Sequence, residues 1–229
     1  MSKAATKQAA SRWGSVIVAI GLLAAAAYSS WPLGYYLNPK VGATGYASEL
    51  AVRGQPYNWV FIISDVLAGA LVLVLAWLLY RQFNKRLTSW HKWLLGLFAA
   101  FGTLTIFAAL LPMSCTPSIS ICPAGEHDPQ MILHNVVSIA AGLAIYTTAF
   151  MVWRRYDRDR RMLHIHIILA ALTTFGILSF FYSFIPGPAY LAQRYFLIAT
   201  CAWIFLLPFS FVKDRVMFER IPSNRRKYR

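Results

Sequence analysis

The sequence predicts an all-α, polytopic membrane protein with six transmembrane helices and both termini in the cytoplasm. Three observations predict this fold class: an apolar composition, six long apolar segments and a one-sided distribution of Lys and Arg. Of the 229 residues, 58% are hydrophobic and only 13% are charged. That leaves too little polar surface to cover a water-soluble globule, whereas lipid can surround the apolar faces of a membrane protein.

Six apolar segments are long enough to cross a hydrocarbon core about 30 Å thick, which takes about 20 helical residues. They lack the alternation of apolar and polar residues that marks a transmembrane barrel, so their backbone groups must pair within helices. The expected spans are residues 13–35, 58–80, 92–113, 130–153, 163–185 and 193–212, in one transmembrane domain that covers residues 1–229.

The positions of the basic residues predict the orientation of these spans. With the N-terminus inside, all of the 22 Lys and Arg residues except Lys40, Arg53 and Arg194 fall on the cytoplasmic side. Such an excess is the rule for multi-pass membrane proteins. The net charge of +14 therefore reflects membrane topology, because the basic residues lie in short clusters between apolar segments. We expect membrane lipids or a membrane protein as partners, and no nucleic acid.

The segment between the third and fourth expected spans carries Cys115 and Cys122 and contains no Lys or Arg. In the predicted orientation it lies outside the cytoplasm, where disulfides form. The pattern favours a structural disulfide between Cys115 and Cys122, with Cys201 free. A redox-active pair is disfavoured, since it would need a relay pair and Cys201 is the only other cysteine.

Several polar residues fall inside the expected spans, where an unpaired charge costs several kcal/mol. At 1.5 Å per residue, Asp65 lies about 10 Å below the outer end of the second span and His134 about 7 Å below that of the fourth. Arg194 begins the sixth span at the same surface. This shared depth marks a candidate site in the outer half of the bundle. The candidate ligand-binding residues are Asp65, His134, Arg194, Ser64, Asn135 and Ser138.

Three interpretations of these residues stay open. In the first, Asp65 pairs with His134 or Arg194 as a polar clamp between helices, and the protein is a purely structural subunit of a membrane complex. In the second, the residues form an outward-facing pocket for a lipid headgroup, a small ligand or a membrane partner. In the third, Asp65, His134 and His127 hold zinc in a metal-dependent membrane hydrolase. Our working hypothesis is the second, a binding protein that is not an enzyme and needs no cofactor.

Short motifs in four parts of the chain strengthen the membrane interpretation. They are Ile63-Ser64-Asp65, Leu111-Pro112 before a polar loop, Asp128 with His134, and Gln193-Arg194 before a helix that carries Trp203. Together they resemble a bacterial family of six-helix integral membrane proteins, domain of unknown function 998. The resemblance implies the six-helix fold, a bacterial cytoplasmic (inner) membrane and a link among Asp65, His134 and Arg194. It implies no activity. Met113-Ser114-Cys115 replace the acidic residues expected in the loop, so no ligand role is carried over there.

Overall fold

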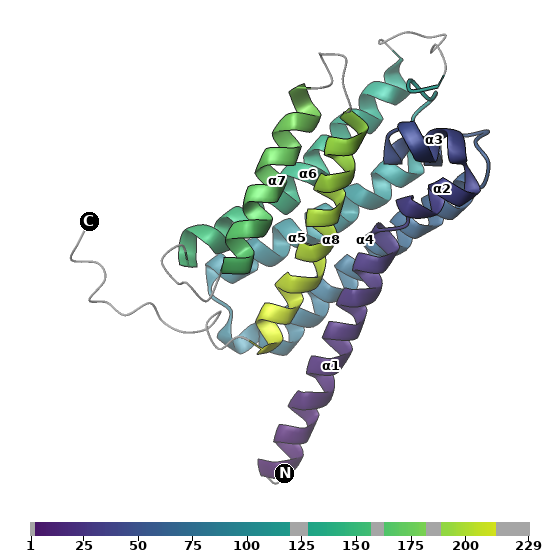
Figure 1. The fold of residues 1–229 in the computed structure, drawn as a ribbon. Coiled ribbons are helices and arrows are strands. Elements are labelled where there is room, and N and C mark those ends of the chain that lie inside the picture. The colour runs from purple at the N-terminus through teal and green to yellow at the C-terminus, as the bar shows by residue number, and fades with distance from the viewer. Residues whose placement is uncertain (1–2, 120–127, 157–162, 182–188, 214–229) are drawn as a thin grey trace, which may run out of the picture.

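The chain forms a helical bundle in a computed structural model, which describes residues 3–119, 128–156, 163–181 and 189–213 (Figure 1). No strand occurs within these residues. The long helices are α1 (Lys3–Tyr28), α4 (Asn58–Phe83), α5 (Ser89–Leu110), α6 (Pro129–Tyr156), α7 (Leu163–Phe181) and α8 (Ala189–Lys213). Each packs against the next in this order, and α8 also packs against α1, which closes the bundle.

Five of these helices are long and apolar enough to cross a membrane. The corresponding segments are Trp13–Leu37, Asn58–Arg86, Ser89–Leu110, Pro129–Arg155 and Tyr190–Val212. Helix α7 is 19 residues long, but its apolar part is the shorter stretch His166–Leu178. The all-helical, multi-pass character predicted from the sequence is thus confirmed, and the sixth span stays a prediction.

The first expected span, residues 13–35, is not one continuous helix. Helix α1 ends at Tyr28, where Ser29-Ser30 and then Pro32 interrupt it. Serine side chains compete for backbone hydrogen bonds, and proline has no N–H to donate. The chain continues through η1 (Trp31–Leu33), α2 (Gly34–Leu37), α3 (Pro39–Thr44) and η2 (Ala47–Ala51). These short elements, residues 31–51, form a cap on the end of the bundle away from the N-terminus, which we call the outer end (Figure 1).

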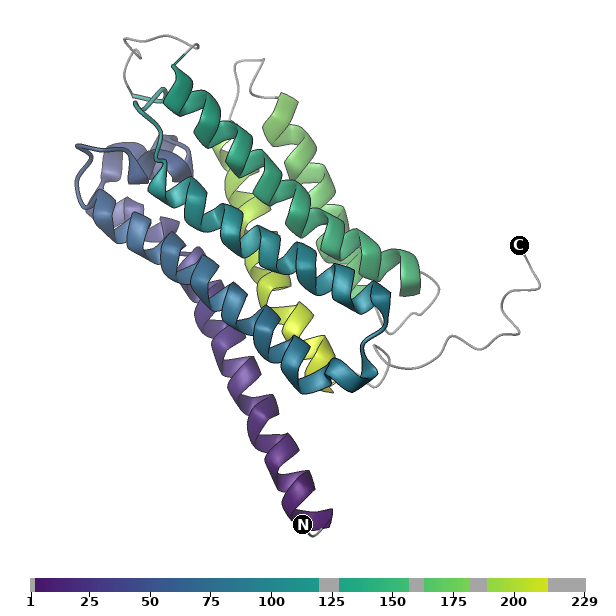
Figure 2. The same cartoon turned by 180° about the vertical axis from the view of Figure 1, so that it is seen from behind.

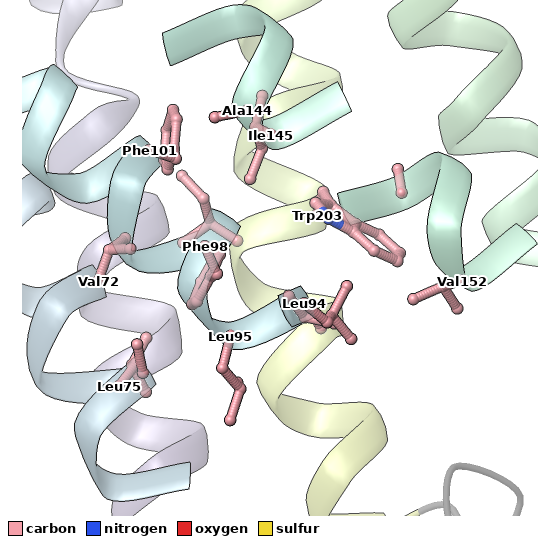
Figure 3. Close-up of a cluster of buried hydrophobic side chains, with 14 of the residues drawn as sticks. Val72, Leu75, Leu94, Leu95, Phe98, Phe101, Ala144, Ile145, Val152 and Trp203 are labelled. Carbon is pink, nitrogen blue, oxygen red and sulfur yellow. The ribbon is translucent and has the colours of Figure 1, made fainter. Parts of the chain in front are cut away.

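The centre of the bundle is filled by one apolar cluster to which all the long helices contribute. Trp203 of α8 is the largest of the fully buried side chains and lies beside Leu94 of α5 and Ile145 of α6 (Figure 3). Its indole Nε1 donates a 2.7 Å hydrogen bond to the Thr148 hydroxyl of α6. A buried N–H without an acceptor would cost about 1–3 kcal/mol, so this bond helps to fix the register of α8 against α6.

Helices α4 and α5 approach closely at two glycines. A Cβ atom added to Gly69 would lie 2.5 Å from the carbonyl oxygen of Gly102, and one added to Gly102 would lie 2.8 Å from that of Gly69. Both distances are too short for a carbon atom, so the two backbones can touch only while neither residue has a side chain. Small residues commonly allow such contacts between transmembrane helices.

Gly69→Ala is therefore expected to push α4 and α5 apart and to lower the free energy of unfolding by about 1–3 kcal/mol. Gly96→Ala in α5 is the control, because a Cβ atom at Gly96 meets nothing within 4 Å. Thermal unfolding of the two purified variants in the same detergent checks the prediction. Equal melting temperatures would contradict a tight contact at Gly69.

Candidate functional site

Arg194 connects helix α8 to the cap. The residue is only 3% exposed. Its Nη2 donates to the carbonyl oxygens of Val41 at 3.4 Å, Gly42 at 2.7 Å and Gly45 at 2.8 Å, and its Nη1 donates to the Tyr35 hydroxyl at 2.8 Å. These three carbonyls lie at the C-terminal end of α3, where the helix dipole is negative. The Val41 carbonyl also accepts the backbone N–H of Gly45 at 2.7 Å, whereas the last carbonyls of a helix have no partner within it. The guanidinium therefore caps α3 and holds it against the start of α8.

Aromatic rings surround the same guanidinium. Its Cζ atom lies 5.3 Å from the ring centroid of Trp31, 5.4 Å from that of Tyr35 and 5.1 Å from that of Tyr190. Ring faces attract a cation, and the attraction grows when water is excluded. Among the side-chain nitrogen and oxygen atoms in the described part of the chain, only Nε of Arg194 and Nε1 of Trp31 are buried without a hydrogen-bond partner. These contacts characterise Arg194 as a structural anchor.

Glu49 is a second ionisable side chain that the cap buries completely. Its Oε2 accepts hydrogen bonds from the hydroxyl and the backbone N–H of Ser118, and its Oε1 accepts one from the backbone N–H of Tyr46 at 3.5 Å. Burial raises the pKa of the Glu49 carboxyl, while these hydrogen bonds and the charge of Arg194 oppose the rise. Glu49 thus ties the cap to the segment that follows α5.

Neutral side chains join the same segments. Gln193 accepts a 2.8 Å hydrogen bond from the backbone N–H of Ala47, which adds a second link between α8 and the cap. Asn38 donates to the side-chain oxygen of Gln55 at 2.8 Å, and Gln55 donates to the Thr116 hydroxyl at 3.5 Å. The cap, the start of α8 and the segment after α5 are therefore one hydrogen-bonded unit.

His134 binds backbone carbonyl oxygens at the outer end of α5, as Arg194 does at the end of α3. It is buried in α6, with Nδ1 2.8 Å from the carbonyl oxygen of Leu111 and 3.2 Å from that of Ala108. A carbonyl oxygen can only accept, so Nδ1 carries the proton. Nε2 is then the acceptor for the Ser138 hydroxyl at 3.4 Å. The imidazole satisfies carbonyls left free at the end of α5 and so joins α6 to α5.

Asp65 of α4 differs from Arg194 and His134 in its surroundings. Among the residues that the structure describes, it takes part in no hydrogen bond or ion pair. It is partly exposed and lies close enough to Tyr28 of α1 and Cys201 of α8 to interact electrostatically with both. The Tyr28 ring in turn meets the Phe101 ring of α5 edge-on, with centroids 5.5 Å apart. Asp65 therefore lies where α1, α4 and α8 meet, below the cap.

The structure distributes the predicted site residues over separate contacts. Arg194 bonds to the cap and His134 to the end of α5, and in the described residues neither bonds to Asp65. Ser138 accompanies His134, and Ser64 is half-buried beside Asp65 in the sequence. Asn135 is exposed on the surface of α6. The sequence predicted that Asp65, His134 and Arg194 lie together. The described residues show no direct bond among these three side chains.

Two predictions fall on residues outside the described ranges. His127, the third proposed zinc ligand, is one of them. In the described residues no three His, Cys, Asp or Glu side chains are grouped to hold a metal ion. The second residue outside the described ranges is Cys122, the proposed disulfide partner of Cys115. Cys201 is a free cysteine. The zinc site and the disulfide stay predictions.

Sequence reasoning missed Glu49 and the carbonyl partners of Arg194. A signal for Glu49 was present, because it is one of only eight acidic residues and follows an expected transmembrane segment. No comparable signal marks Val41, Gly42 and Gly45, since any residue provides a carbonyl oxygen.

A family model described as "Protein of unknown function (DUF998)" matches residues 24–209. The matched region contains the cap and the three residues Asp65, His134 and Arg194. No curated protein and no solved structure matches the chain.

Arg194→Gln is expected to lower the free energy of unfolding by about 3 kcal/mol or more, because each hydrogen bond to a charged group contributes about 1.5–3 kcal/mol. Arg53→Gln removes the same charge from an exposed position after the cap and serves as the control. Thermal unfolding in detergent compares the two. If both variants melt at the temperature of the wild type, Arg194 does not anchor the cap.

Proposed function

The chain belongs to the DUF998 family of proteins of unknown function, and we propose that it is a ligand-binding protein whose site is centred on Asp65. The proposed ligand carries an ammonium group, as does the headgroup of an aminophospholipid or a small free amine. In this proposal the protein is not an enzyme. The site opens towards the outer half of a six-helix bundle in a bacterial cytoplasmic membrane.

The observation that carries the proposal is the lack of a bonding partner for Asp65 among the described residues. An unpaired carboxylate within a membrane costs several kcal/mol, and proteins keep such groups where they serve a function. Arg194 and His134 have hydrogen bonds that account for their burial. The clamp interpretation therefore suits Arg194 and His134, and the pocket interpretation suits Asp65.

The surroundings of Asp65 favour a cationic ligand. A carboxylate complements an ammonium group, and an aromatic ring such as that of Tyr28 adds attraction to a cation. Ser64, which precedes Asp65 in the sequence, and Cys201 are neutral groups that can share hydrogen bonds. Partial exposure of Asp65 leaves it accessible to a ligand. Nothing comparable favours the metal-dependent hydrolase, in which Asp65 and His134 would act together.

Asp65→Asn is expected to abolish binding without lowering the stability of the ligand-free protein, because it removes an unpaired acid. Thermal unfolding in detergent, with ethanolamine or with phosphatidylethanolamine added, measures both effects. A ligand at a hundred times its dissociation constant stabilises the wild type by about 2.7 kcal/mol. A response to both ligands identifies the amine as the recognised group, and a response to the lipid alone adds the phosphate or the chains.

Asp128→Asn is the matched control for that experiment. Asp128 caps the start of α6, where its Oδ1 accepts a 3.1 Å hydrogen bond from Gln130, and asparagine caps helices almost as well. The control should keep the ligand-induced shift in melting temperature. If Asp65→Asn also keeps the ligand-induced shift, the proposed site is wrong. The proposal is also contradicted if Asp65→Asn, without ligand, loses as much stability as Arg194→Gln.

We also propose that α7 is the sixth span and that both termini lie in the cytoplasm. The end of the bundle opposite the cap carries Lys85 and Arg154, in agreement with an excess of basic residues inside. A thiol reagent that does not cross membranes should label Arg53→Cys but not Lys85→Cys in intact cells, with Cys201→Ser as the background. The opposite labelling pattern would reverse the proposed orientation.

The disulfide between Cys115 and Cys122 fits this arrangement. Ser118 and Thr116, which lie between the two cysteines in sequence, bond to Glu49 and Gln55. A disulfide would close a short loop around these residues and restrict the unfolded chain. We therefore propose that it helps to hold this segment against the cap.

A further inference from the structure

The end of the bundle opposite the cap carries an exposed aromatic and basic surface on α4. Trp77, Arg81 and Lys85 follow one another at intervals of four residues, so they share one face of α4 and the turn η3 (Asn84–Arg86). Trp77 is 54% exposed, and Arg81 and Lys85 are exposed as well. The Cζ atom of Arg81 lies 5.3 Å from the ring centroid of Trp77, within the range of a cation–π contact.

The start of α5 lies at the same end of the bundle, where the short turn η3 joins it to the end of α4 (Figure 2). Lys92 is exposed and Trp93 is 71% exposed. We call this surface the basic rim, and it consists of Trp77, Arg81, Lys85, Lys92 and Trp93.

No acidic residue of the described ranges lies near the basic rim. The acidic residues in those ranges are Glu49, Asp65 and Asp128, and all three lie in the outer half of the bundle. The charge of the rim is therefore not balanced by described carboxylates of the protein. A partner with negative charge complements it.

We propose that the basic rim binds the headgroup of an anionic phospholipid, with phosphatidylglycerol as the representative. The order of residues along α4 supports a lipid over an acidic protein. Leu67 and Val74 are exposed apolar residues further towards the outer end, Trp77 follows, and Arg81 and Lys85 come last. This is the order of acyl chain, interface and phosphate across one leaflet, where tryptophan favours the interface and basic residues meet anionic headgroups.

The site is independent of Asp65, because it lies at the other end of the bundle and recognises the opposite charge. The guanidinium of Arg81 and the ammonium groups of Lys85 and Lys92 supply hydrogen-bond donors for phosphate oxygens. A lipid without net charge, such as phosphatidylcholine, offers the same phosphate but adds a cation beside it. We therefore expect the basic rim to bind phosphatidylglycerol more tightly than phosphatidylcholine.

Native mass spectrometry of the purified full-length protein, titrated with each lipid in detergent, tests the proposal. The wild type should retain phosphatidylglycerol with at least about tenfold higher affinity than phosphatidylcholine, and the double variant Arg81→Gln/Lys85→Gln should lose most of that preference. The control Lys40→Gln/Arg53→Gln removes two exposed charges from the outer side and should keep it. Equal retention of the two lipids by the wild type, or equal losses in both double variants, would overturn the proposal.

A salt titration of the wild type provides a test that needs no variant. Exposed ionic contacts are screened at high ionic strength, so retention of phosphatidylglycerol should fall steeply as salt is added, whereas retention of phosphatidylcholine should change little. Binding of phosphatidylglycerol that does not respond to salt would show that the acyl chains, not the basic rim, hold the lipid.

Discussion

The bond between the Arg194 guanidinium and the end of α3 is the interaction on which the outer half of the structure depends. A buried cation must recover the hydration that it loses, and here it does so on the carbonyl oxygens of Gly42 and Gly45 and on three aromatic rings. The same contacts satisfy carbonyls that a short helix would otherwise leave unpaired. Arg194 thus holds the cap against the start of α8, while Val41 and Leu50 of the cap pack in one apolar cluster with Phe61 of α4. Glu49 and Gln193 add further hydrogen bonds between the cap and its neighbours.

The cap in turn defines the surroundings of Asp65. Helix α1 ends at Tyr28, immediately before the cap, and Tyr28 is also a neighbour of Asp65. The anchored cap therefore lies over the place where α1, α4 and α8 meet. The Asp65 carboxyl group there is partly exposed and is bonded to none of the described residues. In our account, the hydrogen bonds of the cap hold the surrounding helices in place, and the Asp65 carboxyl stays available to a ligand.

Much of the fold could be predicted from the sequence, because long apolar segments have few alternatives to helices in a membrane. The interruption after Tyr28 was harder to predict, since the segment up to Leu37 is apolar on average in spite of Ser29 and Ser30. The depth of Asp65, His134 and Arg194 also followed from counting residues, but depth does not specify partners. His134 and Arg194 bond to backbone carbonyls, which every residue has, so side-chain identity gave no indication of these bonds.

The most direct test of the account is the reactivity of Cys201, a free thiol near enough to Asp65 for the two side chains to interact electrostatically. Alkylation of the wild-type protein by iodoacetamide can be followed by mass spectrometry with and without phosphatidylethanolamine. If a ligand occupies the space next to Asp65, a concentration of lipid that raises the melting temperature should also slow the alkylation of Cys201 severalfold. An alkylation rate that the lipid leaves unchanged, under conditions where it stabilises the protein, would place the ligand elsewhere and contradict the proposed site.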